Sequence, residues 1–171
     1  MSLPKSVQKL ITQFDKLPGI GPKTSEKLVF HLLNRPKEDL KEFADSLLDA
    51  KEQITICPIC FNYSDTTPCS ICSSSARDKK TICVVAETQD VQAIEKTNNF
   101  QGIYHVLQGT INPPEGITPD KLRLRELQER IQKDQPNEVI LALNHDIAGE
   151  ATSLYLIKLL KDTNINITRL A

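Results

Sequence analysis

The sequence of 171 residues contains no long apolar run, no internal repeat and no low-complexity tract. No stretch approaches the roughly 20 apolar residues that a membrane-spanning helix needs. The first residues, Met-Ser-Leu-Pro-Lys-Ser, lack the apolar core of a secretion signal, which leads us to expect a cytoplasmic location. These absences indicate a globular protein with one ordinary domain or two small ones, without a membrane partner.

A large net charge is also missing, but the charges are unevenly distributed. The formal charge at pH 7 is −1. Residues 1–37 hold seven Lys or Arg against Asp15 and Glu26, a balance of +5, whereas the rest of the chain carries 14 basic and 20 acidic residues. A basic N-terminal region predicts a polyanionic partner there.

Four of the five cysteines form two closely spaced pairs, Cys57 with Cys60 and Cys69 with Cys72. Two C-x-x-C pairs at this separation can present four thiolates tetrahedrally to one ion, and soft sulfur ligands favour Zn²⁺. Four protein ligands leave no position for water, so we predict a structural zinc site, one per chain. The alternative is a pair of disulfides, which would require an oxidising compartment.

The N-terminal region has the pattern of three helices. A first helix is predicted from apolar residues at helical spacing, which are Val7, Leu10, Ile11, Phe14 and Leu17. A second should begin at Pro22 with Leu28, Leu32 and Leu33 facing inward, and a third should run from Pro36 to Gln53 with a core face of Leu40, Phe43, Leu47 and Leu48.

The turn between the first two helices predicts a helix-hairpin-helix motif. Gly19 and Gly21 would let backbone N–H groups approach a phosphate, and Lys23 and Lys27 would add positive charge. Such binding should be independent of DNA sequence and sensitive to salt. The alternative is a plain hairpin of two helices whose glycines only reverse the chain, and we interpret His31 as an ordinary helix residue.

After the cysteines, residues 73–80 read as a polar linker and the pattern changes to alternating strands and helices, typical of a parallel α/β unit. Strands are predicted at 81–86, 103–107, 138–143 and 165–170, and helices at 89–97, 119–134 and 149–161. The middle helix should have Thr118 as its N-cap and Pro119 in its first turn. Cys83, inside the first strand, is most simply a small core residue.

Acidic residues gather at the carboxyl ends of two predicted strands: Glu87 and Asp90 after the first, Asp146 and Glu150 after the third. If these strands are neighbours, the carboxylates could hold Mg²⁺ for phosphoryl chemistry. Alternatively, Asp90 and Glu150 occupy first helical turns simply because the helix dipole favours acids there. His145 is too isolated to support a catalytic role.

The order of these motifs resembles the family of the bacterial recombination mediator RecR over nearly the whole chain. The carrying segments are 17–23, the four cysteines, 82–87 with Asp90 and 94–95, 104–109 with Pro113 and 116–117, and 138–142 with Asn144 and 149–152. The resemblance implies a helical helix-hairpin-helix region (1–53), a four-cysteine zinc finger (54–76) and a Toprim domain with a Rossmann-like, mainly parallel sheet (77–171).

The resemblance also implies a function, a non-enzymatic DNA-binding scaffold in recombinational repair. Such proteins form dimers or ring-shaped tetramers and act with RecO, and often RecF, to load RecA onto gapped or single-stranded DNA. The family usually has an acid where this chain has Ala148, and it normally continues beyond Ala171 with a further strand and helix.

Because of Ala148, we interpret Glu87, Asp90 and Glu150 as a partner-docking or vestigial metal surface. The main alternative is a Mg²⁺-dependent Toprim nuclease. A topoisomerase is disfavoured because no tyrosine is marked as a nucleophile by its context, and a zinc-stabilised adaptor that never touches DNA would make the N-terminal charge incidental.

Overall fold

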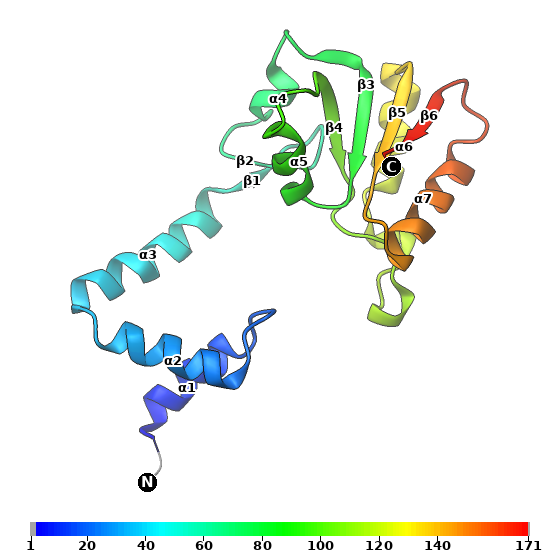
Figure 1. Cartoon of the computed structure of the whole chain (residues 1–171). Coiled ribbons are helices and arrows are strands. Elements are labelled where there is room, and N and C mark those ends of the chain that lie inside the picture. Colours follow the sequence, from blue (N-terminus) through cyan, green and yellow to red (C-terminus); the bar gives the residue numbers. More distant parts are fainter. Residues whose placement is uncertain (1–2, 171) are drawn as a thin grey trace. The chain divides into compact units, whose positions relative to one another are not determined.

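The computed structural model describes residues 3–170. The chain divides into two compact units, Met1–Gln53 and Ile54–Ala171. The helices are α1 (Lys5–Phe14), α2 (Pro22–Leu33), α3 (Lys37–Gln53), α4 (Ser70–Ser73), α5 (Thr88–Glu95), α6 (Leu124–Asp134) and α7 (Ile147–Leu159) (Figure 1). The strands are β1 (Thr55–Ile56), β2 (Tyr63–Ser64), β3 (Asp78–Val85), β4 (Gly102–Val106), β5 (Glu138–Ala142) and β6 (Asn166–Arg169). Among the described helices, none has the length and apolar character required to cross a membrane.

The first unit contains the three predicted helices, but its buried residues differ from those expected. Ser25 and Val29 of α2 are fully buried, and the Ser25 hydroxyl donates to the Gly21 carbonyl at 3.3 Å. Leu28 and Leu32 were predicted to face inward and are half-buried, whereas Leu33, predicted to face the same way, is 46% exposed. The inward face of α2 is therefore rotated by about one residue from the predicted face, because small Ser25 allows close packing that hydropathy does not reveal.

The prediction that the apolar face of α3 is buried in the core is wrong for the single chain. Leu40 is half-buried, but Phe43, Leu47 and Leu48 are 47%, 60% and 63% exposed. The helical period correctly marked an apolar face, but it contains no information about what covers that face.

The second unit is built around a parallel four-stranded sheet with the strand order β4-β3-β5-β6. β3 and β5 are direct neighbours, with Val85 opposite Ala142 at their carboxyl ends. The chain leaves β3 toward β4 on one side and returns to β5 on the other, so the topological switch point lies between the carboxyl ends of β3 and β5. The sequence-based hypothesis required the strands before the two acidic pairs to be neighbours, and β3 and β5 are neighbours.

Helices cover both faces of this sheet. α6 and α7 pack on one face through buried residues that include Leu127, Ile131 and Leu156. α5 covers β3 and β4 on the other face, where Cys83, Tyr104 and Val91 are buried. The prediction that Cys83 is a core residue is confirmed, since it is 3% exposed.

Helix α6 begins later than predicted. Thr118 and Pro119 do start a helical turn, but it is a short 3-10 helix (η2, Pro119–Lys121) that ends before α6 begins at Leu124. Between them Leu122 is extended and 5% exposed, and the Arg123 N–H donates to the Leu107 carbonyl at 3.0 Å. Burying Leu122 against the end of β4 interrupts a helix that propensity alone would have continued.

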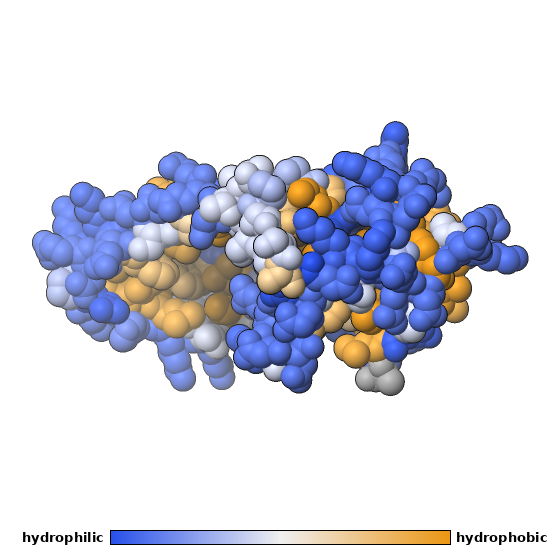
Figure 2. Space-filling model, turned by 90° about the horizontal axis from the view of Figure 1, so that it is seen from above, coloured by the Kyte–Doolittle hydropathy of each residue, from blue (hydrophilic) through white to orange (hydrophobic). Residues whose placement is uncertain are grey.

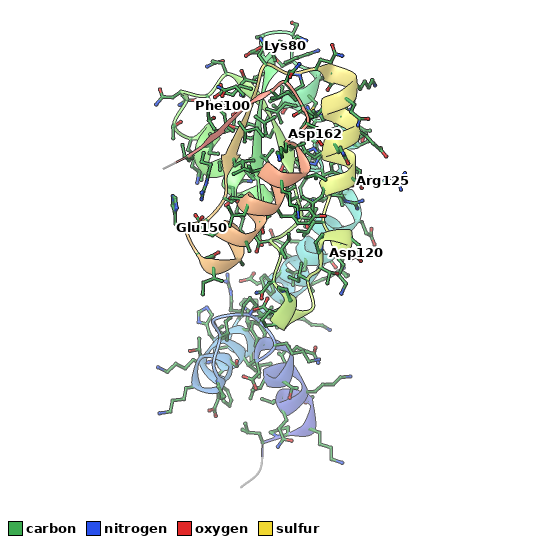
Figure 3. The ribbon with its side chains drawn as sticks, turned by 90° about the vertical axis from the view of Figure 1, so that its right-hand side faces the viewer. Lys80, Phe100, Asp120, Arg125, Glu150 and Asp162 are labelled. Carbon is green, nitrogen blue, oxygen red and sulfur yellow. The ribbon has the colours of Figure 1, made fainter. Side chains whose placement is uncertain are left out.

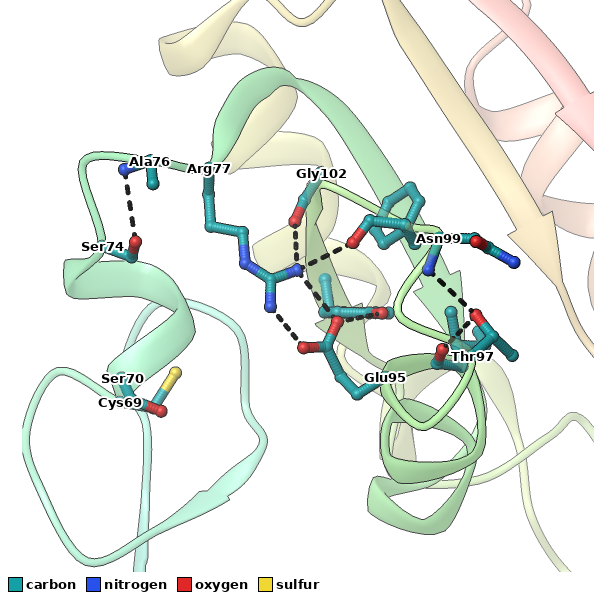
Figure 4. A network of polar contacts seen from close by, with 12 residues as sticks. Cys69, Ser70, Ser74, Ala76, Arg77, Glu95, Thr97, Asn99 and Gly102 are labelled. Carbon is teal, nitrogen blue, oxygen red and sulfur yellow. Dashed lines mark hydrogen bonds and ion pairs between the residues drawn. The ribbon is translucent and has the colours of Figure 1, made fainter.

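The predicted linker also contains structure, because β3 begins at Asp78. Just before it, the Arg77 guanidinium forms a two-point ion pair with Glu95 and donates to the carbonyls of Phe100 and Gly102 at 3.2 and 3.3 Å (Figure 4). The Tyr104 hydroxyl donates to the same carboxylate at 2.6 Å. These polar residues tie the start of β3 to α5 and β4, which a hydropathy pattern cannot detect.

Candidate zinc centre and nucleic-acid interface

The turn before α2 has the geometry that its glycines predicted. Gly19 has a φ of +77°, a left-handed conformation that favours glycine, and the Ile20 N–H donates to the Leu17 carbonyl at 3.1 Å. Gly21 is the N-cap of α2 and Pro22 follows in the first turn. No side chain caps this helix N-terminus. Pro22 has no N–H, and the N–H groups of Thr24 and Ser25 already donate to the Gly21 carbonyl at 2.9 and 3.0 Å. Within the first turn, the N–H of Lys23 is therefore the group left for an external acceptor such as a phosphate oxygen.

Lys23 and Lys27 lie on the exposed side of α2, where they line a shallow hollow of about 500 Å³ with Phe30, His31 and other residues of the same helix. Among residues 3–170, neither lysine forms an ion pair. Arg35, by contrast, is engaged by Asp39 at 2.9 Å. The two lysines next to the hairpin therefore keep their charge available for an anion.

The four predicted zinc ligands are brought together. The sulfur atoms of Cys57, Cys60, Cys69 and Cys72 all lie within 4.8 Å of one another, and Cys60 Sγ is 3.6 Å from Cys69 Sγ. Three of these cysteines are buried and Cys72 is partly buried. Backbone N–H groups point at the sulfurs, from Cys69 to Cys57 Sγ at 3.5 Å and from Cys72 to Cys69 Sγ at 3.4 Å. The cysteines are unpaired, with no disulfide among them.

The protonation of these thiols fits a cation-binding site. A hydrogen bond with the Cys72 thiol lowers the pKa of Cys60 to about 5, while burial raises the pKa of Cys69 to about 11. The hydrogen bond to Cys60 also raises the pKa of Cys72. The cluster thus stabilises one thiolate through its neighbouring thiols, and several thiolates at this spacing require a cation between them. Four convergent sulfurs and N–H donors to sulfur match the ligand set of tetrahedral Zn²⁺.

The cysteine loop is fastened to the end of β4. The Val106 N–H donates to the Cys60 carbonyl at 2.8 Å, and the Gln108 side chain donates to the Phe61 carbonyl at 2.6 Å. Phe61 has a φ of 63°, which is unusual for a bulky residue. Its ring meets the His105 ring edge-to-face, with 5.3 Å between the ring centroids, and the Arg123 guanidinium carbon lies over the Phe61 ring at 5.0 Å from its centroid. A metal that holds Cys60 would therefore also fix how Phe61 packs on the sheet.

The acids that follow β3 lie at the switch point, but one of them serves its own helix. The Asp90 carboxylate accepts a hydrogen bond from the Glu87 N–H at 2.8 Å at the start of α5. Glu87 is exposed and lines a small hollow of about 240 Å³ with Tyr63, Thr88 and Gln108 among its neighbours. The alternative explanation for Asp90, a helix-terminal acid, has direct geometric support.

The acids that follow β5 are also engaged. Asp146 caps α7 by accepting from the Gly149 N–H at 2.7 Å, and Glu150 forms an ion pair with Arg169 of β6. His145 Nδ1 lies 3.7 Å from the Glu150 carboxylate. Within the described part of the chain, the four cysteines are the only group of three or more His, Cys, Asp or Glu side chains placed to hold an ion.

Comparison with known proteins agrees with this geometry. Family models match residues 7–51 as the helix-hairpin-helix of RecR, 54–74 as the four-cysteine zinc finger domain of RecR and 80–171 as a Toprim domain. A curated relative, the recombination protein RecR of Moorella thermoacetica, is 48% identical over 171 residues, which are all of this chain and 86% of the relative. The chain belongs to the RecR family.

Membership of the RecR family gives the cysteine cluster its cofactor. The family model for the zinc finger covers all four cysteines, and the sulfurs are placed for one tetrahedral ion. The cofactor is therefore structural zinc. When bound, the ion would neutralise the thiolates of Cys57, Cys60, Cys69 and Cys72 and hold the loop closed.

The sequence did not predict several residues that contact the acids or the cysteine loop. Arg169, which engages Glu150, lies 19 positions away on an edge strand, and no spacing rule connects them. Arg123 and Gln108 hold Phe61 from segments far from the cysteines. The only available signal was Phe61 itself, an aromatic residue directly after a ligand cysteine, which often packs on a neighbouring element.

Proposed function

We propose that this chain is a non-enzymatic, DNA-binding scaffold in recombinational DNA repair. The proposal depends mainly on one observation, the uncapped N-terminus of α2 with Lys23 and Lys27 exposed beside it. It is supported by membership of a family whose curated relative is named a recombination protein. The backbone N–H of Lys23 and the two ammonium groups would contact phosphates without reading bases.

The partners are proposed from the family: RecO, in many bacteria RecF, and through them the loading of RecA onto gapped or single-stranded DNA. The scaffold would be a dimer or tetramer. Exposed Phe43, Leu47 and Leu48 on α3 support self-association, since an apolar face of this kind is costly to leave in water. Sedimentation of the purified protein over a range of concentrations measures the oligomeric state directly.

We propose a scaffold rather than the alternative Mg²⁺-dependent nuclease because the acids have other engagements. Asp90 and Asp146 cap helices, Glu150 pairs with Arg169, and Ala148 stands where the family usually has an acid. A two-metal phosphoryl-transfer site needs several convergent free carboxylates. Glu87, Asp90 and Glu150 are better suited to docking a partner or to a vestigial metal role.

The experiment that tests DNA binding replaces both hairpin lysines. Lys23→Ala with Lys27→Ala should weaken binding equally on unrelated duplexes and reduce the slope of log K against log salt by about 1.8, because each lost phosphate contact removes roughly 0.9 released counterions. Fluorescence anisotropy over a range of salt concentrations measures both quantities.

The matched control is Lys41→Ala with Lys51→Ala, which removes the same charge from exposed positions of α3. The control should keep nearly the whole slope. If the hairpin variant and the control behave alike, then the hairpin does not contact DNA and net charge alone explains the binding.

A further inference from the structure

A groove of about 570 Å³ lies between the zinc finger and α6. The zinc finger contributes Pro58, Ile59 and Cys72 to one wall. β3 contributes Lys79 and Lys80, and α6 contributes residues along its length, including Arg130 and Lys133. Both walls belong to the unit Ile54–Ala171.

The carboxylates in this groove are already matched with arginines. Each of the three acids that line it has its own partner on or next to α6: Glu126 with Arg123 at 2.7 Å, Glu129 with Arg125 at 2.9 Å, and Asp134 with Arg130 at 3.4 Å. These pairs leave the lysines to determine the charge that an incoming ligand meets.

The lysines of the groove have no carboxylate partner among the described residues. Lys80 is held by the end of α6, where its ammonium donates to the carbonyls of Asp134 and Gln135 at 3.1 and 3.0 Å. Lys79 and Lys133 are exposed, and neither takes part in an ion pair within residues 3–170. Three ammonium groups, two from β3 and one from α6, therefore line the groove without a carboxylate partner, and those of Lys79 and Lys133 are free of other polar partners among the described residues.

The groove is at the end of the sheet opposite the acids. Lys79 and Lys80 are near the beginning of β3, whereas Glu87 follows its carboxyl end. Figure 3 places Lys80 and Glu150 at opposite ends of the unit. The surface seen from above, toward the end that carries Lys80, is mostly hydrophilic with smaller apolar areas (Figure 2). A polyanion at the groove would thus be kept away from the acidic end.

We propose that this groove binds the phosphate backbone of single-stranded DNA, as a second contact that rests on the proposed DNA-binding function. The chemistry favours phosphates over the carboxylates of an acidic peptide. Planar carboxylates are bound best by the paired N–H groups of arginine, and Arg123, Arg125 and Arg130 are all engaged. Lysine is a point charge that accepts successive phosphates without a fixed orientation, and Ile59, which is 39% exposed, offers apolar surface to sugars and bases.

The test is binding of a fluorescein-labelled oligothymidylate of about 20 nucleotides, which cannot pair with itself, to the full chain loaded with zinc. Lys79→Ala with Lys133→Ala should reduce the salt slope by about 1.4, at roughly 0.7 counterions per single-strand contact. The same loss corresponds to about 25-fold weaker binding at roughly 0.1 M salt. Unchanged zinc content and tyrosine fluorescence would show that the variant is folded.

The matched control is Lys158→Ala with Lys161→Ala, which removes two exposed charges at the end of α7, outside the groove. It should lose little affinity. Equal behaviour of the groove variant and this control would overturn the proposal. So would a groove variant that keeps its affinity for oligothymidylate but loses binding of a decaglutamate peptide, since the groove would then be a site for acidic peptides.

The Lys23→Ala, Lys27→Ala variant is measured in parallel, so the two proposals fail separately. A normal groove variant with a defective hairpin variant refutes the groove contact and leaves the proposed function standing. A defective groove variant with a normal hairpin variant supports the groove and moves DNA binding away from α2. If neither variant differs from its control, both proposals are wrong.

Discussion

Acid should destabilise the unit Ile54–Ala171 through the buried imidazole of His105. This side chain is fully buried, and its Nε2 donates to the Arg123 carbonyl at 2.8 Å. Its Nδ1 has no hydrogen-bond partner among the described residues. The Phe61 ring packs edge-to-face with the imidazole, and the nearby charges are those of Arg123, Arg130 and Glu126. A second proton would therefore sit on a buried nitrogen with no acceptor.

Burial lowers the pKa of His105 from its ordinary 6.5 to about 4. The unfolded chain consequently binds a proton at higher pH than the folded chain, so the contribution to stability is complete above about pH 6.5 and is lost as the pH falls toward about 4. At about pH 5 the unfolded imidazole is almost fully protonated and the folded one almost fully neutral. The resulting loss between about pH 8 and about pH 5 is about 2 kcal/mol.

The assay is urea unfolding at both of these pH values, followed by tyrosine fluorescence. The chain has no Trp and its three tyrosines, Tyr63, Tyr104 and Tyr155, all lie in the second unit, so the signal reports on that unit alone. His105→Gln can keep the donor to the Arg123 carbonyl but does not titrate. It should lose about 2 kcal/mol less than the wild type over this pH interval.

The control for this comparison is His145→Gln, because the His145 side chain is 64% exposed. This variant should follow the wild type, and zinc content is measured at both pH values because acid also protonates thiolates. Equal losses in the wild type and His105→Gln would refute the reasoning, since the acid sensitivity would then arise from other groups.

Three further predictions concern the metal, the polar network and the acids. Metal analysis should give about one zinc per chain, and Cys57→Ser should lose the metal and unfold the cysteine loop; a folded, zinc-free protein with free thiols would contradict this. Glu95→Gln should lower the free energy of unfolding in urea by about 2 kcal/mol, because it breaks the ion pair with Arg77. The loss should be larger at about pH 7 than at about pH 3. Arg77 lowers the pKa of Glu95, so the stability that the pair contributes disappears as that carboxylate is protonated. Glu87→Ala with Glu150→Ala should leave DNA affinity intact in anisotropy but weaken capture of a RecO-like partner; DNA cleavage with Mg²⁺ or Mn²⁺ that Glu87→Ala abolishes would instead favour the nuclease.

Regular elements with a strong period were predictable from the sequence. The four parallel strands of the second unit are where the pattern indicated, because burial of their apolar side chains is what forms them. The cysteine spacing was also sufficient, since two C-x-x-C pairs have few other uses. Both signals are local, and both reflect the interaction that holds the structure together.

What the sequence could not predict depends on contacts between distant segments. The interruption at Leu122, the start of β3 in polar residues and the ion pair of Glu150 with Arg169 are each set by a partner far along the chain. The exposed face of α3 is a different case, because hydropathy indicates that a face is apolar but not whether the same chain covers it. For the acids, the same sequence positions were compatible with metal binding and with helix capping. The hydrogen bond from the Glu87 N–H to the Asp90 carboxylate identifies Asp90 as a capping residue.

The burial of Cys83 makes the thiol count of this protein informative about its metal. Its side chain is 3% exposed and burial raises its pKa to about 12, so it should react with a disulfide reagent only when the sheet unfolds. The other four thiols are the zinc ligands. In the native, zinc-loaded protein almost no thiol should therefore react with such a reagent. After removal of zinc with a chelator up to four thiols per chain should react, and after denaturation all five. Counting sulfhydryls in a spectrophotometer would thus separate loss of the ion from loss of the fold, without any added label.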